Sequence, residues 1–344
     1  MLSQAYLFLR LVTGVNFDVA VIGAGPAGTA TAISCREAGM KVALLESVPF
    51  PRFQVGESLH PGTEVLLHKL GVAQEILGEG FLRYAGIWTR IAGKRRFTAF
   101  GSDFRGTWMG FQVDRARFDT ILLSRARRSG ADFFSCRTQA VRRTPRGVLI
   151  GTDCGQLRCR VVVDATGSRR WVARQLKSKS IQCSPTIVAR YGYREGEVPH
   201  LSECPVFRFR QSGWHWVARV GPDRYQWISA SWGTDLSPSV PKEVELLRPV
   251  SRVRGADVTW RILYRAASPD FVAVGDAAAT VDPASSRGIL RALSSGIMAG
   301  YCIERILNVR SKANEIAQFY HDWIRRGFAR DTDKLNQIYG PSIL

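Results

Sequence analysis

Long apolar runs separated by helical stretches are the first pattern in this 344-residue chain. Residues 17–46 read as an apolar strand, a glycine-rich loop, a helix through Ala38 and a second apolar strand. The segments VVVDATG at 161–167 and VAVGDAA at 272–278 are further apolar runs that end in small residues. Buried strands that alternate with helices are typical of a parallel sheet with helices on its faces. The pattern therefore predicts an α/β domain.

Other segments follow different periodicities. Helical apolar spacing at 61–78 and 117–129 predicts two further helices of this domain, and 302–328 predicts one or two amphipathic helices. Segments 80–112 and 181–262 are instead rich in aromatic residues and valine with short alternations. This second pattern indicates a half-buried antiparallel sheet.

One hairpin in the aromatic region can be read in detail. The turn sequence GPDR at 221–224 separates two strand-like runs. Alternation along the first run puts Trp214 and Trp216 on one face, and His215 and Val217 on the other.

These patterns give a domain prediction: a discontinuous α/β domain interrupted by an antiparallel β-sheet domain. The α/β domain takes residues 16–80, 110–180 and 262–344, the inserted domain takes 81–109 and 181–261, and residues 1–15 form an N-terminal arm.

The glycine-rich loop carries the first chemical signal. Gly23, Gly25 and Gly28 have the G-x-G-x-x-G spacing between a strand and a helix. This spacing permits a tight turn, a close approach to pyrophosphate and close helix–strand packing. The loop from Gly23 through Ala24, Gly25, Pro26 and Ala27 to Gly28 is therefore predicted to bind a dinucleotide at the helix N-terminus. Glu46 closes the second strand, where it can accept hydrogen bonds from an adenosine ribose.

A second nucleotide signal lies far along the chain. Asp276 ends an apolar strand, and ligands of doubly wound sheets bind at such strand ends. An acid at this point suits the ribityl hydroxyl groups of FAD better than it suits NAD. The following segment DPASSRGIL ends in a helix start that can direct N–H groups at the N1/C2=O edge of a flavin. We therefore predict that FAD is the cofactor and that the α/β domain is a Rossmann-like FAD-binding domain.

These motifs together resemble a known superfamily. GAGPAG, PRFQVGESL (51–59), VDRARFD (113–119), VVDATG and VGDAAATVDPASSRGILRALSSG are similar to the FAD-dependent monooxygenases with a p-hydroxybenzoate-hydroxylase-like fold. The nearest branch contains flavin-dependent tryptophan halogenases, tailoring oxidoreductases and tryptophylquinone-maturation enzymes. The resemblance implies that Arg115 lies near the flavin and that Val141 contacts adenine through its backbone.

The resemblance implies further flavin contacts and a role for the inserted domain. Pro283, Gly288 and Ile289 would line the isoalloxazine ring, and Arg52 and Ser58 would lie in the loop at its edge. The inserted sheet would be a substrate domain that covers the ring.

Three positions depart from the halogenase pattern. Halogenases typically contain W-x-W-x-I-P, whereas residues 214–219 read WHWVAR. Tryptophan halogenases have a lysine early in the substrate domain, where this chain offers Arg83, and a glutamate where it has Ser285. An arginine cannot readily form the corresponding haloamine. We therefore predict a monooxygenase that hydroxylates an electron-rich aromatic group through a flavin C4a-hydroperoxide, with His60 and His215 as candidate bases.

The substrate and the alternatives stay open at this point. The aromatic group belongs to a natural-product intermediate or to a tryptophan in a peptide or protein undergoing cofactor maturation. Halogenation and reduction of a prenyl chain are the alternative reactions, and a non-catalytic flavoprotein is a further one. NAD(P)H or a separate flavin reductase would supply electrons, because the sequence has no second dinucleotide loop.

Composition limits the classes of partner that we expect for this protein. The formal net charge of +19 suits an acidic peptide or protein substrate, and the basic clusters are dispersed without a nucleic-acid-binding signature. No apolar run is long enough for a transmembrane segment. The seven cysteines are scattered, and Cys154 and Cys159 lack a second pair or a nearby histidine. We therefore predict reduced thiols, a cytoplasmic location and no metal site.

Overall fold

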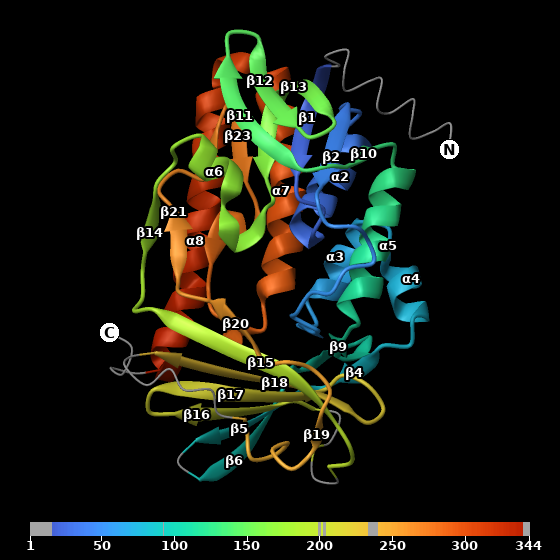
Figure 1. Cartoon of the computed structure of the whole chain (residues 1–344), viewed down its shortest axis with the longest axis vertical. Coiled ribbons are helices and arrows are strands. Elements are labelled where there is room, and N and C mark those ends of the chain that lie inside the picture. The colour runs from blue at the N-terminus through green and yellow to red at the C-terminus, as the bar shows by residue number, and fades with distance from the viewer. Residues whose placement is uncertain (1–15, 92, 199–200, 202–203, 233–239, 340–344) are drawn as a thin grey trace.

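The computed structural model describes residues 16–91, 93–198, 201, 204–232 and 240–339. The predicted arm, residues 1–15, lies outside the described residues. Figure 1 shows two sheets, one above the other, with the long C-terminal helices lying along the upper sheet.

The upper sheet contains the strands predicted from the long apolar runs. Its parallel part runs β10 (Asp132–Ser135), β2 (Val42–Glu46), β1 (Asn16–Ile22), β13 (Gly155–Asp164) and β23 (Phe271–Ala273). On the side away from β1, the two halves of β13 pair with different strands. Its first half pairs with β12 (Gly147–Thr152), which forms an antiparallel meander with β11 (Thr138–Thr144). Its second half pairs with β23, which carries the short antiparallel strand β22 (Ala267–Ser268). The strands of residues 17–46, 161–167 and 272–278 therefore lie in one sheet with their carboxyl ends at one edge.

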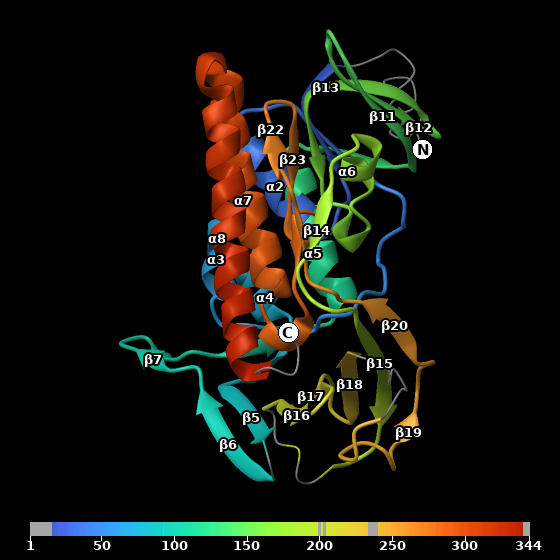
Figure 2. The same cartoon turned by 90° about the vertical axis from the view of Figure 1, so that its left-hand side faces the viewer.

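Helices cover this sheet, and two glycines allow the closest packing. Helix α2 (Pro26–Glu37) packs on α7 (Gly288–Asn308), which is followed by η4 (Arg310–Lys312) and α8 (Ala313–Tyr339). A Cβ atom at Gly296 would lie 2.5 Å from the carbonyl oxygen of Ala27, and one at Gly300 would lie 2.5 Å from Cβ of Ser34. The side of the sheet that α7 and α8 cover is clear in Figure 2.

The remaining helices match the predicted segments with one difference. Asp114 caps the N-terminus of helix α5 (Arg115–Arg128), because its side chain accepts a hydrogen bond from the backbone N–H of Arg117. The helix predicted at 61–78 is two helices, α3 (Thr63–Lys69) and α4 (Ala73–Gly78). They are separated at Gly71, whose φ of +68° is not helical. A short helix α6 (Trp171–Gln175) follows η1 (Gly167–Arg169).

The lower sheet contains the aromatic segments. Its strands run β19 (Arg248–Pro249), β15 (Ile187–Glu195), β18 (Arg224–Trp232), β17 (Gly213–Arg219), β16 (Val206–Arg210), β5 (Gly86–Ile91) and β6 (Lys94–Ala99), and β20 (Arg254–Asp257) also pairs with β15. The pairing is antiparallel except between β16 and β5, which is parallel. The sheet is therefore mixed, which corrects the purely antiparallel prediction. The α/β fold with an inserted, mainly antiparallel sheet is confirmed.

Small sheets lie between and beside the two large ones. One contains β3 (Ser58–Leu59), β9 (Gly110–Gln112) and β4 (Leu82–Tyr84), and another contains β14 (Ser180–Gln182), β21 (Arg261–Leu263) and β24 (Ala279–Thr280). The hairpin of β7 (Ser102–Asp103) and β8 (Gly106–Thr107) projects from the body beside β6 in Figure 2.

The face of the lower sheet that looks toward the upper domain is aromatic, and we call it the inner face. Trp214, Trp216 and Trp232 pack there with Leu335 and Tyr339 of α8. Val217 packs in a separate cluster on the outer face. The predicted alternation of the hairpin is therefore confirmed for Trp214, Trp216 and Val217. In the described part of the chain, every helix is too short or too polar to cross a lipid bilayer.

Candidate flavin site

The glycine loop has the geometry that the spacing predicts. Gly23 has φ of +106°, and a Cβ atom there would lie 2.4 Å from the carbonyl oxygen of Ala165. A Cβ atom at Gly28 would lie 1.9 Å from the carbonyl oxygen of Gly23. Helix α2 begins at Pro26 with no side-chain cap on its N-terminus. Its first N–H groups are therefore available to an anion such as pyrophosphate.

Glu46 lies beside this loop at the end of β2. Its Oε2 accepts hydrogen bonds from the backbone N–H of Ala24 and from Arg52, both at 2.9 Å. Its Oε1 accepts from the backbone N–H groups of Ser47 and Val48. The carboxylate is thus fixed at the carboxyl end of β2, next to the loop. A ribose hydroxyl could replace Arg52 there as a hydrogen-bond donor to Glu46.

Arg52 gives an independent indication that an anion belongs here. One of its terminal nitrogens lies 3.3 Å from the position of a Cβ at Gly25, so the guanidinium lies over the loop. Its Nε atom is buried and has no hydrogen-bond partner among the residues that the structure describes. A buried donor without a partner costs about 1–3 kcal/mol. A phosphate oxygen at this point would satisfy it, and the residues therefore fit the phosphate end of FAD.

Asp276 lies close to the same loop although it is remote in sequence. Gly275 has φ of +57°, and a Cβ atom there would lie 2.9 Å from Cβ of Ala27. The neighbouring Asp276 side chain is 48% exposed, and the guanidinium of Arg291 lies 4.0 Å from its carboxylate. The structure therefore brings the two nucleotide signals together and leaves an acid accessible where ribityl hydroxyl groups are expected.

Arg115 anchors the loop that follows Pro51. Its guanidinium is buried and makes two hydrogen bonds of 3.0 Å to Asp119, one turn further along α5. It also donates to the carbonyl oxygen of Val55 at 2.5 Å. Burial acts to lower the pKa of Arg115, but the nearby carboxylates, Asp119 above all and also Glu57 and Asp276, together outweigh it, so the pKa is raised. The guanidinium of Arg115 therefore stays protonated and holds the loop that follows Pro51.

The segment predicted to line the ring is held by a buried acid. Asp282 caps the short helix η3 (Pro283–Ser285) by accepting from the backbone N–H of Ala284 at 2.9 Å. It also accepts from the hydroxyl of Tyr339 at 2.7 Å and from Nε1 of Trp260 at 3.1 Å. Asp282 is not among the site residues predicted from the sequence, although an acid directly before Pro283 is a recognisable helix-cap signal.

The predicted ring contacts follow this cap. Pro283 and Ile289 are partly accessible, and Gly288 starts α7 with no atom of the described residues within 4 Å of its Cβ position. The side chain of Ser285 lies outside the described residues. The open surface at Gly288 is compatible with close approach of a flat ring, and the contacts themselves stay predictions.

His60 lies beside the same segment. Its Nδ1 accepts a hydrogen bond from the backbone N–H of Gly62 at 3.1 Å, and its ring contacts Phe100 at a centroid distance of 5.5 Å. Burial lowers its pKa, and the charges of Arg287 and Lys334 lower it further. A neutral ring with Nδ1 accepting carries its proton on Nε2. His60 is therefore arranged as a hydrogen-bond donor, which argues against the predicted role as a base.

His215 lies on the outer face of the lower sheet. One of its ring nitrogens is 2.8 Å from the guanidinium of Arg210. Burial and the charges of Arg210 and Arg208 lower its pKa to about 4, and Glu243 opposes them. Its strand neighbours Trp214 and Trp216 face the upper domain, so His215 points away from the predicted flavin. This placement argues against the predicted role as a catalytic base.

The structure does not test two of the predicted flavin contacts, Ser58 and Val141. Ser58 donates to the side chain of Gln112 at 2.7 Å, within the small sheet of β3 and β9. Val141 has a buried side chain in β11, at the outer edge of the meander. Both stay predictions.

Glu57 is the functional candidate that the sequence did not reveal. It is 5% exposed and accepts hydrogen bonds from the hydroxyl of Tyr193, from the side chain of Gln226 and from the backbone N–H of Gly56. Burial raises its pKa, and the bond from Tyr193 opposes the increase. Tyr193 and Gln226 belong to the inner face. Glu57 therefore joins residues 51–59, which we call the flavin-edge loop, to the lower sheet.

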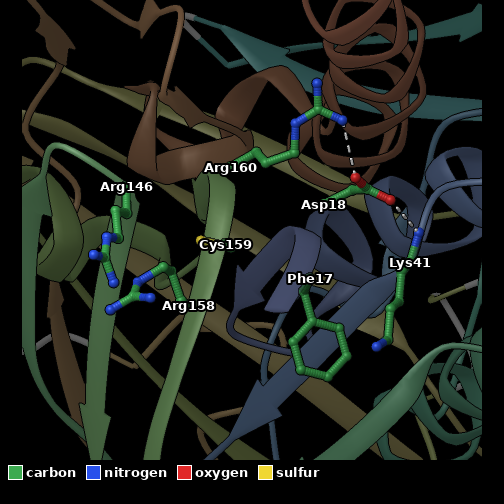
Figure 3. Close-up of a pocket in the computed structure, with 7 residues that line it drawn as sticks. All are labelled: Phe17, Asp18, Lys41, Arg146, Arg158, Cys159 and Arg160. Carbon is green, nitrogen blue, oxygen red and sulfur yellow. Dashed lines mark hydrogen bonds and ion pairs between the residues drawn. The ribbon is translucent and has the colours of Figure 1, made fainter. Parts of the chain in front are cut away.

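A separate surface hollow lies at the opposite edge of the upper sheet. It has a volume of about 440 Å³ and is lined by basic side chains, Lys41, Arg146, Arg158 and Arg160, with Phe17, Asp18 and Cys159 (Figure 3). Asp18 pairs with Arg160 at 3.1 Å. Phe17 and Asp18 open β1, whereas Gly23 follows its end. Ligands of parallel sheets bind at the carboxyl ends of strands, so this hollow is not part of the flavin site.

The comparisons with known proteins agree with this cofactor site. The family model described as "FAD binding domain" matches residues 16–300. A relative from Pseudoalteromonas luteoviolacea, a 1H-pyrrole-2-carbonyl-[peptidyl-carrier protein] brominase, is 25% identical over 91% of this chain and 83% of its own length.

Solved structures show the same fold. The flavin-dependent brominase Bmp2 aligns with a TM-score of 0.79 and 22% identity over 94% of this chain and 88% of its own. The peptidyl tryptophan dihydroxylase QhpG aligns with a TM-score of 0.76 and 23% identity over 95% and 75%.

Proposed function

Since the chain belongs to the FAD binding domain family, we propose that it is an FAD-dependent enzyme that halogenates an electron-rich aromatic ring. The observation that carries the choice of reaction is the similarity to the pyrrole-carbonyl brominase, which extends over most of both chains. Hydroxylation is the main prediction from the sequence and halogenation the alternative, and this similarity reverses the order.

Hydroxylation is the second candidate, and two observations favour it. The fold is shared with a peptidyl tryptophan dihydroxylase. Arg83, at the position matched to the halogenase lysine, is held by Glu64 at 2.7 Å and by the carbonyl oxygens of Gly110 and Met109. A guanidinium fixed in this way has little freedom to carry a reactive species to a substrate.

The chain's own residues divide the work around the cofactor. Arg52, Glu46 and the N-terminus of α2 would bind the phosphates and ribose, and Asp276 would bind the ribityl chain. When reduced and bound, FAD supplies the reaction with dioxygen that oxidises a halide ion or delivers oxygen to a ring. His60 would donate a hydrogen bond from Nε2 and so orient a carbonyl or hydroxyl group of the substrate.

The inner face would bind the aromatic ring itself. Tyr191, Phe209 and Ile228 are partly accessible on this face, beside the buried tryptophans. Apolar walls exclude water, which protects a reactive species from hydrolysis and strengthens the polar contacts that remain.

The substrate would be carried by an acidic protein. The β7–β8 hairpin projects from the body in Figure 2. Phe104 lies between its two strands and is 90% exposed. All six residues of the adjacent edge strand β6 are exposed, including Lys94, Arg95 and Arg96. Large exposed apolar residues next to exposed cations are typical of a docking surface for an acidic partner. Phe100 connects this surface to His60.

The experiment that tests the function is aerobic turnover with FAD and a flavin reductase. A pyrrole-2-carbonyl carrier protein, free pyrrole-2-carboxylate and indole would be compared with bromide, with chloride and without halide. We expect a halide-dependent mass increase that corresponds to replacement of hydrogen by halogen. An increase of one oxygen atom without halide would favour hydroxylation. Peroxide release without any modified product would contradict both reactions.

A further inference from the structure

Two thiols meet outside the flavin site, at the turn between β12 and β13. Cys136 directly follows β10, whereas Cys154 and Asp153 lie in the β12–β13 turn. One ligand atom of each residue lies within 4.8 Å of the others. Within the residues that the structure describes, no other cysteine belongs to such a group.

Hydrogen bonds hold the carboxylate of Asp153 and the backbone of the turn in place. The backbone N–H of Arg137 donates to Oδ1 of Asp153 at 2.9 Å, and the backbone N–H of Asp153 donates to the carbonyl oxygen of Arg137 at 3.1 Å. The backbone N–H of Cys154 donates to Oγ1 of Thr152 at 3.1 Å. The carboxylate of Asp153 and the backbone of the turn are therefore preorganised by hydrogen bonds that do not depend on an ion.

We propose that Cys136, Cys154 and Asp153 bind one thiophilic divalent metal ion of the zinc type. Two thiolates and a carboxylate supply three ligands of a tetrahedral site, and a water molecule completes it. The thiol of Cys154 donates to Oδ1 of Asp153 at 3.4 Å, and the ion takes the place of that proton. Binding converts two thiols and one M²⁺ into a dithiolate complex and releases two protons, with no change in oxidation state.

The site is coupled to the predicted flavin site through the backbone. The backbone N–H of Cys136 donates to the carbonyl oxygen of Glu46 at 2.9 Å, and Ser135 pairs with Glu46 in the sheet. The ion thus fixes the end of β10 against the strand that ends at the predicted ribose ligand. An effect of the ion on FAD affinity rests on the proposed function, whereas metal binding itself does not.

The test uses the full chain, reduced and stripped with a chelator, and titrated with Cd²⁺ and Zn²⁺. We expect one ion per chain by native mass spectrometry, a thiolate-to-cadmium absorption band and release of two protons. Cys136→Ser and Cys154→Ser remove the absorption band, and Asp153→Asn weakens affinity at least about tenfold. Cys183→Ser is the matched control, because Cys183 is an exposed thiol outside the group and its loss leaves binding unchanged.

Circular dichroism of each variant separates loss of the ligand from loss of the fold. Binding retained in a folded Cys136→Ser or Cys154→Ser variant overturns the metal site, as does a wild-type chain that takes up no ion. A Cys136–Cys154 disulfide that forms during purification and persists with metal present also overturns it. A bound ion without any change in FAD affinity overturns only the coupling.

Discussion

The hydroxyl of Tyr193, in the lower sheet, donates a hydrogen bond to the buried carboxylate of Glu57, in the flavin-edge loop. Gln226, its neighbour on β18, donates to the other carboxylate oxygen. The two residues that bind Glu57 thus belong to the inserted sheet, while the acid belongs to the loop anchored by Arg115. A single buried carboxylate therefore fixes the inner face relative to the predicted flavin ring.

Tyr193→Phe removes one of these donors and leaves Glu57 buried with fewer hydrogen bonds. We expect the free energy of unfolding to fall by about 1–3 kcal/mol, and FAD to bind more weakly. Urea denaturation and flavin fluorescence titration measure the two effects. Tyr191→Phe is the matched control, since Tyr191 lies on the same strand and the same face, and it should change stability by less than about 0.5 kcal/mol. Equal effects of the two substitutions would contradict the coupling role of Glu57.

Gly28→Ala tests the glycine loop. A Cβ atom there would lie 1.9 Å from a backbone carbonyl oxygen, so the loop must move and the phosphate cradle is lost. We expect purified protein that keeps its circular dichroism spectrum but contains little or no FAD after reconstitution, measured by absorbance per chain. Gly327→Ala is the control, because nothing lies within 4 Å of that Cβ position on α8. A Gly28→Ala variant that binds FAD normally would refute the cradle.

Arg52→Ala tests the phosphate contact without disturbing the backbone. Loss of one charge-assisted hydrogen bond costs about 1.5–3 kcal/mol, so the dissociation constant for FAD should rise about 10- to 100-fold. The increase should be smaller for riboflavin, which has no phosphate. Equal losses for FAD and riboflavin would mean that Arg52 does not bind the phosphates.

The elements could be predicted from local sequence, whereas the contacts between them could not. The strand, glycine loop and helix of 17–46 follow from periodicity and glycine spacing, which act over a few residues. The break at Gly71 was missed, because helical apolar spacing continues on both sides of it. A positive φ at a single glycine leaves no trace in that periodicity.

Long-range partners account for the site residues that were missed or misassigned. Glu57 meets Tyr193 across 136 positions of sequence, and a polar residue in a short loop gives no signal of such a partner. His215 was expected near the flavin because it lies among aromatic residues. Strand alternation gave its face correctly relative to Trp214 and Trp216, but which face meets the flavin depends on how the whole sheet docks.

His60 is predicted to act as a hydrogen-bond donor and not as a base. His60→Gln keeps an N–H donor of similar reach and should retain most activity, whereas His60→Leu should lower kcat about tenfold, the value of one hydrogen bond. The pH dependence of kcat should be the same in His60→Gln and in the wild type. Loss of the acidic limb in His60→Gln would identify His60 as a titrating base.

His215 should govern the acid stability of the protein. Its pKa is about 4 in the folded chain, below the ordinary value of 6.5, so the unfolded chain binds more protons between these pH values. The stability that neutral His215 contributes is therefore complete above pH of about 6.5 and is lost as pH falls toward about 4. Through this group, the free energy of unfolding is larger above pH of about 6.5 than below pH of about 4, by roughly 3 kcal/mol. His215→Gln should flatten the dependence of the unfolding free energy on pH in this window, measured by urea denaturation. His68→Gln, at an exposed histidine on α3, should leave the dependence unchanged, and an equally flat profile in that control would assign the dependence to other groups.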